Sequence, residues 1–171
     1  MRRQDQHRAA EIAALLDTPA FIDRAEDLYG YRNFICDSGG SICEVVDPDD
    51  PADLVLNALS DRLLLIWIEG SDAHTEELIR RFDRSPKPMY YRPDFLRAKW
   101  AEYLDRNRLG EAEVDPDAFV RWTYAQALAH RQPLYAAMAK NWGIRVRAED
   151  VARIGDAAGF SQLVAQALEA R

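Results

Sequence analysis

Two short stretches decide the fold: NFICDSGGS, residues 33–41, and LLLIWIEG, residues 63–70. Each is an apolar run that ends in an acid, Asp37 or Glu69, with glycine close behind. Continuous apolar runs of this length are typical of strands buried on both faces of a parallel sheet. Because ligands bind beyond the carboxyl ends of such strands, we expect the chemistry to lie near Asp37 and Glu69.

The rest of the chain reads mainly as helix. Apolar residues recur at helical spacing over 5–16 and 93–106, and again from Asp115 past His130, where Pro133 is expected to kink or divide the helix. Residues 144–146 predict a further, weaker strand. The order of these elements predicts a helix-rich α/β fold, a parallel-sheet sandwich with few strands in a single domain over 1–171. So few strands suggest that partner strands are absent from this chain.

Composition excludes several classes of protein. A formal net charge of −7 argues against general nucleic-acid binding, which needs a basic face. No stretch approaches the ~20 apolar residues of a membrane span, and the first residues do not resemble a signal peptide. Cys36 and Cys43 are too few for a zinc site and are expected to be reduced. We therefore expect a cytoplasmic protein that binds neither nucleic acid nor membranes.

Several motifs carry a resemblance to a known family. FICDSGGSICE at 34–44, WIEG at 67–70 and DAHT at 72–75 are followed by RRFD at 80–83 and PKPMYY at 86–91. This pattern, which covers nearly all of the chain, resembles a group of bacterial ATPases similar to small-molecule kinases of the P-loop class. In those proteins a first strand and a Walker A loop precede the part seen here. No G-x-x-x-x-G-K-[ST] phosphate loop occurs in this sequence. The resemblance therefore implies a truncated, carboxyl-terminal part of such a protein.

A wider likeness to enzymes of the shikimate- and gluconate-kinase type rests on the order of motifs. Residues 63–69, 72–82 and 84–88 follow the order of the fourth strand, a helix and an arginine-bearing lid, and RQPLY at 131–135 is similar to the R-x-P-L-Y segment before the last strand. The likeness implies that the complete protein uses ATP and Mg²⁺ and transfers phosphate to an unknown small-molecule acceptor, or hydrolyses ATP. This chain alone is expected to have little or no ATPase activity.

Phosphoryl transfer depends on charge neutralisation and positioning, which suggests roles for the acids, glycines and arginines. Asp37 could hold Mg²⁺ through water or accept a substrate proton; the alternative is that it caps its own turn. The candidate residues are Asp37, Arg84 and Lys87 for catalysis, Ser38, Gly39, Gly40, Ser41 and Arg81 for the acceptor substrate, and Arg131 for the nucleotide. Arg84 and Lys87 fall in a lid-like region at about 83–92. No set of protein metal ligands is predicted.

A different class of function stays open. The chain could be a non-catalytic binding or interaction module that uses a crevice at Asp37–Ser41 or an exposed sheet edge. An unpaired edge invites pairing with another chain, so this alternative predicts self-association.

Overall fold

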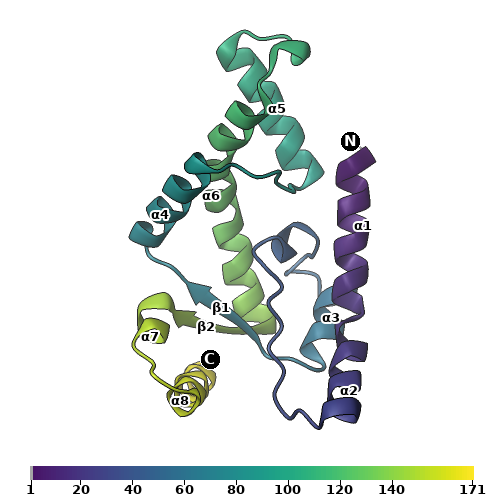
Figure 1. Cartoon of the computed structure of the whole chain (residues 1–171), viewed down its shortest axis with the longest axis vertical. Coiled ribbons are helices and arrows are strands. Elements are labelled where there is room, and N and C mark those ends of the chain that lie inside the picture. The colour runs from purple at the N-terminus through teal and green to yellow at the C-terminus, as the bar shows by residue number, and fades with distance from the viewer. Residues whose placement is uncertain (1) are drawn as a thin grey trace. The chain divides into compact units, whose positions relative to one another are not determined.

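The computed structural model describes residues 2–171, which divide into two compact units (Figure 1). The first, which we call the sheet unit, comprises the chain up to Glu69 together with Leu134–Arg171. The second, the helical unit, is Gly70–Pro133. The prediction of a single domain over 1–171 stays a prediction.

The sheet unit holds both strands and most of the helices. Its elements are α1 (Arg2–Leu16), α2 (Thr18–Tyr29), the 3₁₀ turn η1 (Ile42–Glu44), α3 (Leu54–Ser60), β1 (Leu65–Glu69), the last turns of α6 (Pro116–Trp142), β2 (Gly143–Arg147), α7 (Ala148–Ala152) and α8 (Ala157–Glu169). The helical unit contains α4 (Asp72–Arg84), α5 (Pro93–Asn107), the 3₁₀ turn η2 (Glu111–Glu113) and the first part of α6.

The sheet consists of β1 and β2, which pair in parallel with Leu65 opposite Gly143 and Glu69 opposite Arg147. Glycine is needed at position 143, because a Cβ there would lie 2.1 Å from the carbonyl oxygen of Leu65. This pairing confirms the α/β class and two of the expected strands.

The two strands differ in how far their apolar side chains are exposed to solvent. On β2 the apolar side chains of Ile144 and Val146 are buried, whereas Arg145 and Arg147 are exposed. On β1 residues 65–68 are all apolar, yet Ile68 is 50% exposed. The composition of β1 is that of a central strand, but the described residues supply it with one neighbour only.

The prediction of a strand at residues 33–36 is wrong. These residues form no strand, and Ile35 is 93% exposed. A strand exists only where a neighbour shares its backbone hydrogen bonds, and in residues 2–171 the ladder contains β1 and β2 alone. An apolar run without a neighbouring strand stays an exposed loop.

Pro133 does not divide the long helix, because α6 runs from Pro116 to Trp142; the alternative expectation, a kink at Pro133, stays a prediction. Proline removes one backbone hydrogen bond and crowds the preceding turn, at a cost of ~3 kcal/mol. Contacts on both sides of Pro133 hold the helix: Arg131 is hydrogen-bonded to Tyr90, and Tyr135 to Gly40.

The core of the helical unit is aromatic. Tyr91, Phe95 and Ala127 are buried together, with Met89 and Leu96 packed against them. The hydroxyl of Tyr91 lies 2.9 Å from that of Thr123, a fully buried residue of α6. These contacts fasten the segment after α4 to α6.

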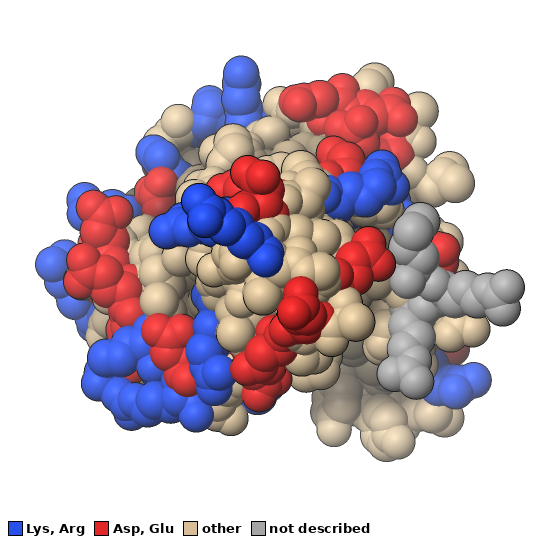
Figure 2. Space-filling model, turned by 90° about the horizontal axis from the view of Figure 1, so that it is seen from above, with Lys and Arg blue, Asp and Glu red and all other residues tan. Residues whose placement is uncertain are grey.

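Charges of both signs alternate over the face seen in Figure 2, and neither sign covers it. Within the described part of the chain, none of the helices has both the length and the apolar content that crossing a bilayer demands.

Candidate functional site

The segment Asp37–Ser41 forms a tight, exposed turn. One carboxylate oxygen of Asp37 accepts a hydrogen bond of 2.9 Å from the backbone N–H of Gly39, so Asp37 caps its own turn. Gly39 has φ +67°, a left-handed conformation that favours glycine. Asp37 itself remains exposed to solvent. The capping alternative for Asp37 is therefore realised, and its expected catalytic role stays a prediction.

Tyr135 of α6 fixes the turn from one side. Its hydroxyl donates a 2.6 Å hydrogen bond to the carbonyl oxygen of Gly40, and a Cβ at position 40 would lie 3.0 Å from that hydroxyl. The ring of Tyr135 also contacts Trp67 of β1, with 6.2 Å between the ring centroids. One tyrosine thus joins the glycine turn to the strand that precedes α4.

Helix α1 holds the next residue of the turn and the segment that follows it. The hydroxyl of Ser41 donates a 2.6 Å hydrogen bond to the carboxylate of Glu11. The guanidinium of Arg8 donates to the backbone carbonyls of Glu44, at 2.6 Å, and Val45, at 3.1 Å. Glu44 is only 1% exposed, so a buried acid lies directly behind the turn. Sequence reasoning did not identify Arg8, Glu11 or Tyr135, which lie at least 30 residues from their partners.

The predicted cations lie in the helical unit. Arg81 and Arg84 occupy the last turn of α4 and Lys87 the loop after it, and all three are exposed. Cations are favoured at a helix C-terminus by the helix dipole. The arginines of α4 act on a neighbouring acid: a hydrogen bond from Arg80 lowers the pKa of Glu77, and the charges of Arg84 and Arg81 lower it further.

Arg131 is more buried than its expected contact with a nucleotide suggests. It is 5% exposed, and its Nη2 donates a 2.9 Å hydrogen bond to the carbonyl of Tyr90. It therefore anchors the lid-like region to α6. The neighbouring His130 stacks on Phe95 at 4.7 Å between ring centroids. Its Nε2 is buried and makes no hydrogen bond within residues 2–171.

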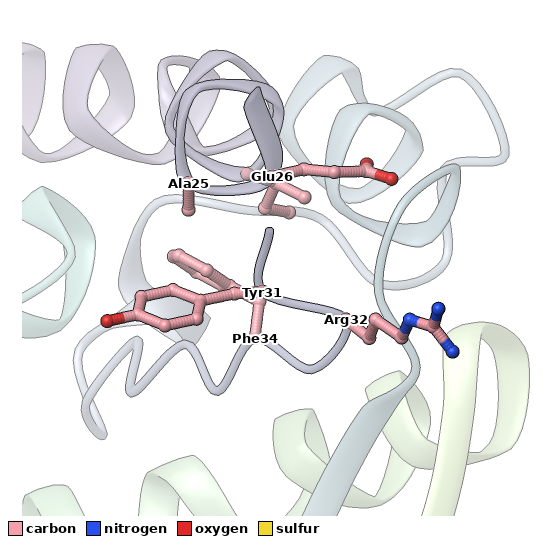
Figure 3. A pocket seen from close by; sticks show the side chains of 6 residues that line it. Ala25, Glu26, Tyr31, Arg32 and Phe34 are labelled. Carbon is pink, nitrogen blue, oxygen red and sulfur yellow. The ribbon is translucent and has the colours of Figure 1, made fainter. Parts of the chain in front are cut away.

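A pocket of about 300 Å³ lies between α2 and the segment that returns after it (Figure 3). Ile22, Ala25 and Glu26 line it from α2, and Tyr31, Arg32 and Phe34 line it from residues 31–34. It combines two aromatic rings with one cation and one acid. Sequence reasoning missed this pocket, because residues 33–36 were assigned to a buried strand.

No protein metal centre is evident in the part of the chain that the structure describes. It contains no group of three or more His, Cys, Asp or Glu side chains placed to hold a metal ion.

Comparisons with models of protein families, with curated proteins and with solved structures found no match. The chain's own geometry is therefore the basis for assigning a function. That geometry brings Asp37, Gly39, Gly40 and Ser41 together in the sheet unit. Arg81, Arg84, Lys87 and Arg131 belong to the helical unit.

Proposed function

We propose that the chain supplies the acceptor-binding turn and the cationic lid of a P-loop kinase-like protein, ATP- and Mg²⁺-dependent in its complete form. The observation that carries this proposal is the order of elements around a parallel strand pair. β1 is followed by α4 with Arg84 in its last turn, by a loop with Lys87, by α5, and by α6, which leads into β2 beside β1. This is the order on which the sequence resemblance rests.

The fixed glycine turn supports an acceptor-binding role. Hydrogen bonds from Tyr135 to Gly40 and from Ser41 to Glu11 hold its carboxyl end, and Gly39 and Gly40 leave its backbone without side chains. A ligand can approach such a backbone closely. Because the turn is held before a ligand arrives, binding costs little ordering of the protein.

The exposed cations support a lid role. Phosphoryl transfer is accelerated mainly by positive charge placed around the transferring group. Arginine suits this task because its planar guanidinium can donate two parallel hydrogen bonds to one phosphate. Arg81, Arg84 and Lys87 are exposed and lie within one short segment.

The residues of this chain do not by themselves fit a Mg²⁺–triphosphate site. The phosphate-loop motif is absent from the sequence, and no three-ligand cluster lies among the described residues. β1 has one neighbouring strand among the described residues, so its second edge is the place where a further strand with such a loop would pair. We therefore expect no hydrolysis at kinase-like rates of about 1–100 s⁻¹ from the chain alone.

Calorimetric titration with Mg²⁺–ATP tests the proposal. We expect weak binding, weakened further in the double variant Arg84→Gln/Lys87→Gln. Binding should be unchanged in the control Arg106→Gln, an exposed arginine on α5 of the same unit. Absence of nucleotide binding, or equal binding by all three proteins, would count against the lid role.

A second candidate function is a non-catalytic interaction module. The observation that favours it is a concentration of exposed large apolar side chains at Phe21, Leu28, Tyr29, Tyr31, Phe34 and Ile35. Patches of this kind mark interaction surfaces, and the open edge of β1 adds a second one. Sedimentation analysis distinguishes the candidates. Self-association without nucleotide binding, reduced by Ile68→Lys on β1, favours the interaction module.

A further inference from the structure

The chain passes between the sheet unit and the helical unit at two places, and each carries a residue with unusual backbone properties. The first crossing lies between Glu69 and Gly70, and the second between Pro133 and Leu134. Glycine has the widest backbone freedom of any residue. Proline inside a helix removes a backbone hydrogen bond and weakens the helix locally.

At the second crossing, α6 is anchored separately on the two sides of Pro133. Before the proline, Arg131 donates to the carbonyl of Tyr90 within the helical unit. After it, Tyr135 donates to the carbonyl of Gly40 within the sheet unit. Because Pro133 has no N–H, the helix lacks the backbone hydrogen bond from residue 133 to the carbonyl of Ala129, in the turn that ends at this crossing. Sharp bends in helices are found most often at such prolines.

At the first crossing, Gly70 is likewise flanked by residues held in their own units. Glu69 ends β1 and pairs with Arg145 of β2 at 3.5 Å. Ser71 is the N-cap of α4, and its N–H donates a 3.1 Å hydrogen bond to Nδ1 of His74 in a capping box. Gly70 is the single residue between these two fixed ends.

We propose that Gly70 and Pro133 form a two-point hinge about which the helical unit moves as a body. Hinges of this kind are a few loop or element-terminal residues that absorb backbone rotation between two rigid parts. Here both covalent connections between the units fall on such residues. The motion would carry Arg81, Arg84 and Lys87 relative to the Asp37–Ser41 turn. The value of that motion for phosphoryl transfer rests on the proposed function, whereas the hinge itself does not.

Distance distributions between paired spin labels test the hinge. The background is the full chain with Cys36→Ser and Cys43→Ser. One pair of labels spans the two units, at the exposed positions Asp27→Cys in the sheet unit and Arg106→Cys in the helical unit. One reference pair lies within the sheet unit, Asp27→Cys with Glu169→Cys, and one within the helical unit, Glu76→Cys with Arg106→Cys. We expect a broad distribution of distances for the label pair between the units and narrow distributions for the pairs within each unit.

Substitution at the hinge is the decisive step. Pro133→Ala restores the missing N–H, and Gly70→Ala brings a Cβ to 3.1 Å from Cβ of His74. We expect each to narrow the between-unit distribution, and the double variant to narrow it to the width of the within-unit pairs. Pro116→Ala, at the first residue of α6, is the matched proline control and should change nothing.

Two outcomes overturn the proposal. One is a between-unit distribution in the unsubstituted background as narrow as the within-unit ones. The other is a broad distribution that neither single variant narrows while the within-unit pairs stay narrow. The single variants keep the test decisive if the double variant does not fold. None of these readouts uses nucleotide, so failure of the hinge is distinct from failure of the proposed function.

Discussion

The hydroxyl of Tyr135 donates a 2.6 Å hydrogen bond to the carbonyl oxygen of Gly40, across 95 residues of sequence. This contact joins the long helix α6 to the turn that carries Asp37. Because the tyrosine ring also packs beside Trp67, the turn, the helix and the strand β1 share one anchor. The position of the turn therefore depends on Tyr135, which is 95 residues away in the sequence.

Tyr135→Phe removes that hydrogen bond and keeps the ring. We expect the free energy of unfolding to fall by about 0.5–1.5 kcal/mol, the usual contribution of one hydrogen bond. Hydrogen exchange at residues 40–43 should rise further than elsewhere. Tyr29→Phe is the control, since Tyr29 is an exposed tyrosine of the same unit. Equal exchange at the turn in both variants would show that Tyr135 does not hold it.

Gly39→Ala tests the conformation of the turn itself. At φ +67° an L-residue costs about 1–2 kcal/mol, so we expect a loss of stability of that size in urea unfolding. Gly155→Ala is the matched control, because its Cβ would meet nothing within 4 Å and its φ is not positive. A neutral Gly39→Ala would mean that the turn adopts another conformation in solution.

Gly143→Ala should disrupt the sheet. The added Cβ would lie 2.1 Å from the carbonyl oxygen and 2.7 Å from Cβ of Leu65, so β1 and β2 cannot keep their spacing. We expect a loss of stability of roughly 3 kcal/mol or more, which is in the range of severe single substitutions. Circular dichroism melting measures it, again beside Gly155→Ala. A melting temperature equal to that of the control would contradict the parallel register.

The sequence predicted those parts of the fold that depend on local pattern. The apolar run at 63–69, the helical spacing of 93–106 and the strand near 144–146 all correspond to observed elements. The same reasoning failed at residues 33–36, because an apolar run does not reveal whether a neighbouring strand exists to pair with it.

The candidate site could be predicted only in part, for a similar reason. The turn at Asp37–Ser41 was visible from its glycines. Its supports were not, because Arg8, Glu11 and Tyr135 reach it from 30 to 95 residues away. Contacts over such separations depend on tertiary packing, which leaves no local pattern in the sequence. Arg131 was noticed as a motif residue, but its burial against the Tyr90 carbonyl follows from the packing of α6.

Arg131→Met separates the structural role of that arginine from its expected nucleotide contact. The substitution keeps a long apolar stem but leaves the carbonyl of Tyr90 without this donor. We expect a loss of about 1.5–3 kcal/mol, typical of a hydrogen bond to a charged group. Arg121→Met is the control, since Arg121 also donates to a backbone carbonyl, that of Asp83, but is less buried. A stable Arg131→Met protein would argue against anchoring of the lid-like region by this residue.

Alkaline pH should weaken the helical unit through Tyr124, which stacks on Phe82 with 3.9 Å between ring centroids. Burial raises the pKa of Tyr124 above its ordinary value of 10.0, and the charges of Arg131 and Arg81 partly oppose this rise. Because the folded-state pKa is the higher one, the contribution to stability is fully present below pH 10 and is lost as pH rises through the folded pKa. Tyr124→Phe should therefore flatten the decline of stability above pH 10, measured by urea unfolding at a series of pH values. The exposed Tyr31→Phe is the control. An equally steep decline in both variants would exclude Tyr124 as its source.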